Sequence, residues 1–312
     1  MIPGLRRLIV VSVLMALATP VWAQEEPAEA PAAVFKSSVD LVSMAAVVRD
    51  SHGRIVPSLR REDFEVLDSG KSRPILELRT ESAAPASVAL LLDGSGSMKV
   101  GAAGDLSQRI STAILSSLNP SRDDAALYSF DTRLLSVQEF THDMKTVTNR
   151  LSVVDAWGST SLYDAIAGTA AIVSKRTANR RALVVLTDGA DTTSAYPPEQ
   201  VSAIASSLDV PVYVFVMNTS TREGEKVPFE AERRSQLANL ARATGGDFFV
   251  AYDTASTTSA INQLVEELRH QYVLAFEAAG EQGWRNVQIR THKKGLTVRT
   301  RGWYLAGGAP AE

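Results

Sequence analysis

The feature that most constrains the fold is an apolar run, Val88 to Leu92, that stops at Asp93 and is followed by a turn of small residues, 94–97. Such a continuous apolar run is typical of a strand buried on both faces of a parallel sheet. The turn follows the carboxyl end of that strand, where open α/β sheets place their ligand sites. Asp93, Ser95 and Ser97 occupy alternate positions, so one loop can direct three oxygen atoms towards one point. This donor set suits Mg²⁺, which takes oxygen ligands and few protein carboxylates.

Two further segments strengthen this prediction. Residues 158–165 place the hydroxyl of Thr160 just before a predicted helix, and residues 182–189 form a second buried strand that ends in Asp188-Gly189. Read alone, Thr160 is better explained as a helix N-cap, and Asp188 is equally well explained as a turn residue. Read together, the three loops predict one site built from Asp93, Ser95, Ser97, Thr160 and Asp188.

This DxSxS…T…D set resembles the metal-ion-dependent adhesion site (MIDAS) of the von Willebrand factor type A (VWA) domain, and the resemblance covers residues 86–275. It implies that Ser95, Ser97 and Thr160 bind the metal directly, with Asp93 and Asp188 in or near the coordination shell. It also implies Mg²⁺, or Mn²⁺ or Ca²⁺, with an open position that an Asp or Glu carboxylate of a protein ligand completes.

The hydrophobic pattern after residue 86 alternates between strands and helices. We expect helices at 106–118, 162–174, 198–208, 235–243 and 259–270, and strands at 125–130, 134–140, 182–186, 210–216 and 248–252. This alternation predicts an α/β fold with a doubly wound, mostly parallel sheet flanked by helices, Rossmann-like in architecture.

Strand-like segments flank this domain on both sides. Residues 36–84 form a predicted β-rich unit, and residues 276–304 form a predicted hairpin that turns at Lys293-Lys294-Gly295. Neither segment can bury its apolar face alone, so we expect both to pair in one accessory sandwich. With these flanks, the whole chain resembles bacterial proteins of the VWFA-related domain family.

The first 23 residues have the pattern of a signal peptide. Arg6 and Arg7 precede an apolar run too short to span a bilayer, and cleavage is expected after Ala23. Removing them changes the net charge from −3 to −5. Residues 24–35 are predicted to be a disordered acidic linker and 305–312 a tail. With no other long apolar segment, we expect no integral membrane segment in the mature chain and a periplasmic or secreted location.

Composition narrows the function classes. The chain has no cysteine, which excludes disulfides and a lipoprotein anchor, and its acidity argues against nucleic acid as a partner. The four histidines are scattered, and neither a nucleophile elbow nor a phosphate-binding loop is present, so we expect a protein that is not an enzyme.

The leading prediction is therefore metal-dependent protein binding or adhesion outside the cytoplasm. A scaffold subunit of an envelope complex, with a structural metal site, and a metal-assisted hydrolase are the alternatives. Rim candidates are Trp157, Asp191 and Tyr196, although Trp157 is equally explained as a core residue and Asp191 at least equally as a solvated loop residue. The polar connection 218–234 is expected to set partner choice.

Overall fold

The computed structural model describes residues 41–81, 84–99, 102–154, 158–178, 180–217, 228–251, 254–278 and 282–307. The predicted signal peptide and acidic linker, Trp157 and residues 308–312 lie outside the described residues. Among the described helices, none combines the length and the apolar character needed to cross a membrane.

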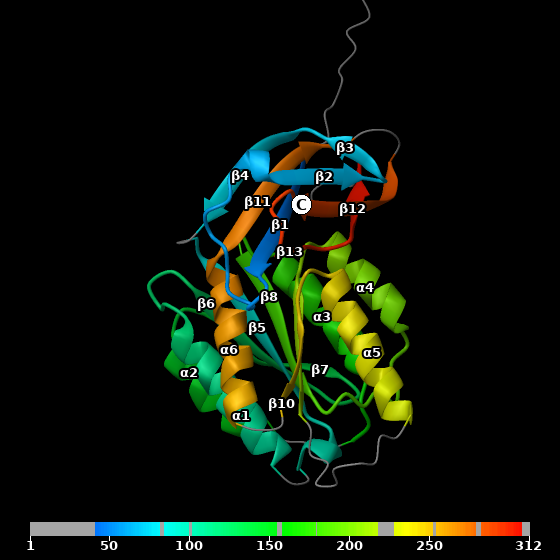
Figure 1. Ribbon diagram of the computed structural model, residues 1–312. Helices are drawn as coiled ribbons and strands as arrows, with labels where there is room; N and C mark the ends of the chain where they lie inside the picture. Colours follow the sequence, from blue (N-terminus) through cyan, green and yellow to red (C-terminus); the bar gives the residue numbers. More distant parts are fainter. Residues whose placement is uncertain are drawn as a thin grey trace, which may run out of the picture. The chain divides into compact units, whose positions relative to one another are not determined.

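A six-stranded sheet forms the centre of the α/β domain (Figure 1). Its strands, in spatial order, are β10 (Phe248–Ala251), β9 (Val212–Met217), β8 (Arg180–Thr187), β5 (Ala86–Asp93), β6 (Asp124–Phe130) and β7 (Leu134–Thr141). All neighbouring pairs are parallel except β6 and β7, which are antiparallel. The predicted doubly wound, mostly parallel sheet is confirmed.

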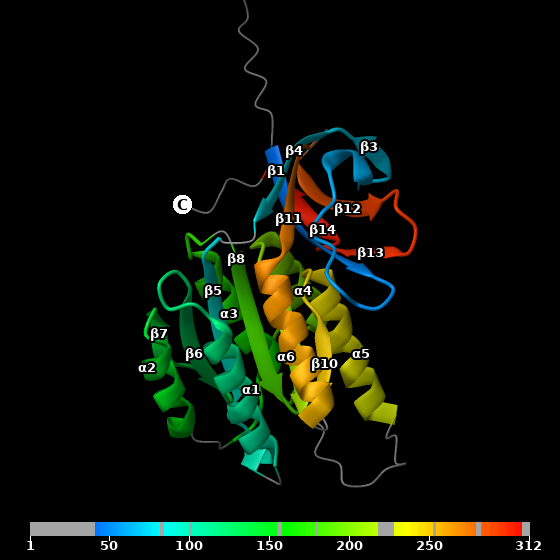
Figure 2. The same ribbon diagram turned by 60° about the vertical axis from the view of Figure 1, so that its left-hand side comes forward.

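Helices cover both faces of this sheet because its central strands are apolar on both faces (Figure 2). Along β5, Val88, Leu90 and Leu92 pack into one buried cluster, and Ala89 and Leu91 into the other. The first cluster includes α1 (Ala103–Ser117), α2 (Met144–Arg150) and α6 (Thr254–Arg269). The second includes α3 (Leu162–Ser174), α4 (Pro198–Ser207) and α5 (Pro228–Ala243). The expected alternation of strands and helices therefore produces three layers.

The segments before and after the α/β domain form the predicted accessory β unit, which consists of two four-stranded sheets. One sheet has the order β13 (Leu296–Arg299), β1 (Leu41–Asp50), β11 (Gln271–Glu277) and β4 (Ile75–Glu81). The other has the order β14 (Trp303–Ala306), β12 (Gly283–Thr291), β2 (Phe64–Asp68) and β3 (Lys71–Arg73). Both sheets contribute to a single buried cluster, which contains Phe64, Leu274 and Val287. Residues far apart in sequence thus bury each other's apolar faces.

The predicted C-terminal hairpin is wrong. β12 pairs with β2 and β14, whereas β13 pairs with β1, so the two strands belong to different sheets. The turn at residues 292–295 carries the chain from one sheet to the other. Val287 and Val298 can then contribute to the same core from opposite sides, which a flat two-stranded ribbon does not allow.

Two predicted boundaries also change. The α/β domain was expected to extend to residue 275, but β11 begins at Gln271 and pairs with β1 and β4 of the accessory unit. The connection expected at 218–234 is shorter, because α5 begins at Pro228. A proline at the first helical position matches the known preference of helix starts.

Candidate metal centre

Strands β5 and β8 bring two of the predicted metal ligands to one edge of the sheet. These strands are parallel neighbours, with Leu92 opposite Leu186. Asp93 is the last residue of β5, and Asp188 comes directly after β8. Because both strands run in the same direction, the two acidic residues emerge side by side at the carboxyl edge, where open sheets place ligands.

Asp93 is nearly completely buried, with 4% of its surface exposed. One carboxylate oxygen accepts a 2.8 Å hydrogen bond from the backbone N–H of Ser95, and the other accepts a 2.5 Å bond from the hydroxyl of Thr187. Burial raises the pKa of Asp93 to about 6, even though hydrogen bonds from Ser95 and Thr187 oppose the shift, and the negative charge of Asp188 adds to it. A cation between these carboxylates would relieve that cost.

The two serines of the turn lie together. The hydroxyl oxygens of Ser95 and Ser97 are 2.9 Å apart, in the short turn that includes the 3-10 helix Gly96–Lys99. Ser95 is buried and Ser97 is exposed. The pair of hydroxyls therefore leads from the buried carboxylate of Asp93 towards solvent.

Thr160 is buried in the segment before α3 and is held by the loop that follows Asp188. Its N–H donates to the hydroxyl of Thr192 at 2.8 Å, and its carbonyl accepts from the N–H groups of Thr192 at 2.8 Å and Thr193 at 3.1 Å. The Thr187–Asp93 bond joins the same loop to β5. The end of β8 and the loop after it are thus tied by hydrogen bonds to each of the other two predicted ligand loops.

The acidic residues around the site hold loops in place. Asp191 accepts hydrogen bonds from the N–H of Leu162 at 2.9 Å and from the hydroxyl of Ser194 at 2.5 Å, so its carboxylate supports the start of α3. Asp164 accepts from the N–H groups of Ala195 and Tyr196. The side chain of Tyr196 is exposed, as a rim residue requires.

Thr187 is not among the residues predicted from the sequence. Its hydroxyl is fully buried, donates to Asp93 and also accepts a 3.0 Å bond from the N–H of Gly189. A signal was present, because the hydroxyl that ends the apolar run 182–186 stands opposite Asp93 when β5 and β8 pair in parallel.

The donor set fits a hard divalent cation. Three hydroxyls and two carboxylates belong to the connected loops, and oxygen donors of this kind are what Mg²⁺ and Ca²⁺ prefer. Within the described ranges no group of three or more His, Cys, Asp or Glu side chains could hold a metal. A cation at this site would therefore depend on the serine and threonine hydroxyls as much as on the acids.

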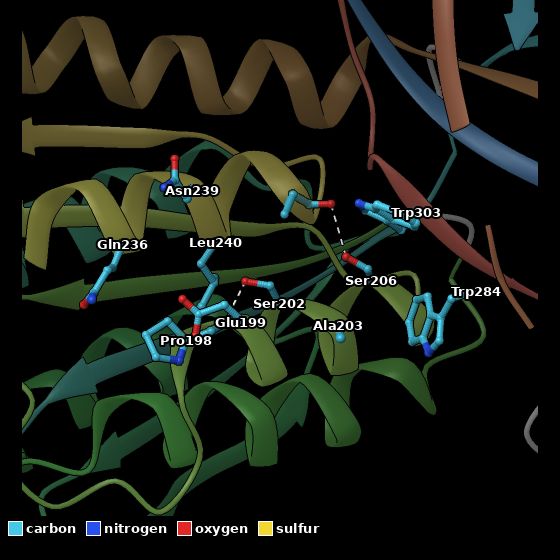
Figure 3. A pocket seen from close by; sticks show the side chains of 11 residues that line it. Pro198, Glu199, Ser202, Ala203, Ser206, Gln236, Asn239, Leu240, Trp284 and Trp303 are labelled. Carbon is cyan, nitrogen blue, oxygen red and sulfur yellow. Dashed lines mark hydrogen bonds between the residues drawn. The ribbon is translucent and has the colours of Figure 1, made fainter. Parts of the chain in front are cut away.

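A separate apolar pocket of about 470 Å³ lies between α4, α5 and the accessory strands β12 and β14 (Figure 3). Trp284 and Trp303 stand at one end of it, and each of these residues is about half exposed, at 47%. Gln236 and Asn239 lie at the other end. None of the five predicted metal ligands lines this pocket, so it is distinct from the candidate metal centre.

The three-layer fold and the hydroxyl-rich edge site define the class of α/β domains that present ligand loops at the carboxyl edge of a parallel sheet. Residues 88–190 match the family model of the von Willebrand factor type A domain. The segment that contains Asp93, Thr160 and Asp188 is thus similar to VWA domains. None of the curated proteins matches the chain.

Solved structures with a similar arrangement have low sequence identity. The conserved hypothetical protein BatB from Bacteroides thetaiotaomicron is 14% identical, with 58% of this chain and 98% of that chain covered and a TM-score of 0.47. A von Willebrand factor type A protein from Catenulispora acidiphila is 11% identical, with coverages of 87% and 74% and a TM-score of 0.49. The pilus adhesin SpaC from Lactobacillus rhamnosus GG is 11% identical, with coverages of 78% and 47% and a TM-score of 0.47.

Proposed function

We propose that this protein binds a protein ligand through a divalent cation held by Asp93, Ser95, Ser97, Thr160 and Asp188. The observation that carries the proposal is the hydroxyl pair of Ser95 and Ser97, 2.9 Å apart, directly beside the buried Asp93 carboxylate. When bound, a divalent cation supplies a coordination position that a carboxylate from the partner can fill.

Each residue has a distinct part in this proposal. Asp93 and Asp188 supply negative charge at the buried end of the site, and Thr187 holds the Asp93 carboxylate through its hydroxyl. Ser95, Ser97 and Thr160 supply neutral oxygens, which leave the cation attractive to an external carboxylate. Asp191 and Asp164 fix the neighbouring loops, because their carboxylates accept hydrogen bonds from backbone N–H groups.

Water-proton relaxation with Mn²⁺ tests the proposal directly. We expect the wild-type chain to enhance relaxation when it binds Mn²⁺, and a peptide bearing an exposed aspartate to reduce the enhancement as it displaces a bound water. The same peptide with asparagine is the matched control. An equal response to both peptides, or an undiminished signal in Ser97→Ala, would contradict a carboxylate-completed site.

We further propose that the protein is exported, to the periplasm or beyond the cell, and has no catalytic activity of its own. The pattern Arg6-Arg7 followed by a short apolar run supports export. Amino-terminal sequencing of the mature protein tests this, with Gln24 as the expected first residue and an intact Met1 as the contrary result.

A further inference from the structure

A second cleft, of about 690 Å³, lies between strands β12 and β13 of the accessory unit. Its lining includes four consecutive residues from each side, 287–290 and 297–300. Successive side chains of a strand point to opposite faces of a sheet, so four in a row reach one cleft only where it runs along the strand edge. The cleft is therefore bounded by strand edges as well as by side chains.

The edge of β13 lacks a strand partner within the described residues. β13 ends its sheet, with β1 on one side, and it makes no ladder with β12. In an antiparallel sheet, alternate residues of an edge strand direct their N–H and C=O groups away from the paired neighbour. Such a row of groups is a template on which an extended chain can form another strand.

The charges around the cleft are mainly positive. Arg49 and Arg299 are neutralised, because both pair with Glu267 and Arg299 also pairs with Asp247. Arg242 and Arg290 are exposed and line the same cleft, and in the part of the chain that the structure describes neither forms an ion pair with a carboxylate. The cleft therefore carries an excess of positive charge beside an unpaired strand edge.

We propose that this cleft binds an extended acidic peptide segment of a partner protein, which adds as a strand to the edge of β13. The main-chain groups of β13 give the peptide its register, and Arg242 and Arg290 select carboxylates on it. The same arginines repel the like-charged edge of a second copy of this chain, which favours an acidic partner over self-association. This site is separate from the candidate metal centre and needs no metal.

Fluorescence anisotropy of a short labelled peptide that alternates valine and glutamate tests the proposal, with the whole chain in the presence of a chelator. We expect saturable binding that weakens as salt rises, and that also weakens when glutamine replaces glutamate in the peptide. A peptide with methylated backbone nitrogens is expected not to bind, because it cannot complete the ladder. Equal binding of the methylated peptide would overturn strand addition.

The double variant Arg242→Gln, Arg290→Gln is expected to lower the affinity about three- to tenfold, since exposed charge pairs contribute modestly. Both residues are exposed, and an unchanged thermal melting curve confirms the fold. An unchanged affinity would overturn the role of the arginines. Binding that requires Mg²⁺ and disappears in Ser95→Ala would place the peptide at the metal centre and overturn the proposal. Dimers of this chain that pair through the edge of β13, and that become more stable in the double variant, would also overturn it.

Discussion

At the scale of single residues, the candidate metal centre depends on groups that hold its ligands in place. Asp93 is almost fully buried, and its carboxylate is supported by one backbone N–H and by the hydroxyl of Thr187. Thr187 is not itself a predicted ligand. It nevertheless connects β8 to β5 beside the candidate metal centre. A substitution of Thr187 therefore tests how the Asp93 carboxylate is supported without removing a predicted metal ligand.

The substitution Thr187→Val tests this connection. It keeps the side-chain shape but removes the hydrogen bond to the Asp93 carboxylate and the bond from the N–H of Gly189, and we expect the free energy of unfolding to fall by about 1–3 kcal/mol. Urea denaturation at neutral pH measures the loss. The control is Thr169→Val, because Thr169 is equally buried but its hydroxyl only donates to the carbonyl of Ala165 within α3. A loss no larger than that of the control would contradict the role of Thr187.

At the scale of secondary-structure elements, a buried ion pair joins two strands of the accessory unit. Asp68 ends β2 and is fully buried, and Arg285 of β12 donates to both of its carboxylate oxygens at 2.8 and 3.0 Å. Burial acts to raise the pKa of Asp68, but the hydrogen bonds and charge of Arg285, together with Tyr304 and Arg73, outweigh it, so the pKa lies below its usual value. The pair thus fastens β2 to β12, which come from opposite ends of the chain.

The depressed pKa gives a pH dependence with a definite sign. The unfolded chain binds a proton at Asp68 near pH 4, whereas the folded chain resists protonation until lower pH. The stability from this pair is therefore complete above about pH 4 and is lost as pH falls further. Melting temperatures measured from pH 6 to pH 3 should fall more steeply for the wild type than for Asp68→Asn, and parallel curves would contradict this account.

Much of the element arrangement could be predicted from the sequence, because it depends on local signals. The apolar run before Asp93 and the strand before Asp188 predicted both the parallel core and the location of the ligand loops. The crossing of the chain from one accessory sheet to the other, between β12 and β13, could not be predicted. A turn such as Lys293-Lys294-Gly295 suits a hairpin, and only the shared core of the two sheets makes the strands separate. The sequence does contain a hydroxyl at the end of β8, but the partner of that hydroxyl, Asp93, follows only from the register of β5 and β8.

At the scale of the whole molecule, Glu267 connects helix α6 to the accessory unit. Its carboxylate is fully buried and accepts a 2.8 Å bond from Arg49 of β1 and another bond from Arg299 of β13. Gln263, one turn earlier in α6, also donates to it at 3.2 Å. The helix that packs on the VWA sheet is therefore fixed to strands from both ends of the chain, so we expect the α/β domain and the accessory unit to unfold together.

The substitution Glu267→Gln is expected to lower the free energy of unfolding by about 3–5 kcal/mol, because it leaves two arginines near a neutral group. The neighbouring Glu266 is exposed, so Glu266→Gln is the matched control with little expected effect. Calorimetric unfolding measures both, and a single transition is expected for the wild type. Two separate transitions in the wild type would contradict the coupling of the two parts.

The proposed metal centre requires that Asp93, Ser95, Ser97, Thr160 and Asp188 together hold a divalent cation. The most direct test is a calorimetric titration of residues 24–312 with Mg²⁺ and Mn²⁺, beside Ser95→Ala and Asp188→Ala. We predict one bound cation in the wild type and an affinity at least about tenfold weaker in each variant, equivalent to about 1.4 kcal/mol. No binding to the wild type at millimolar metal, or equal binding to both variants, would contradict the account.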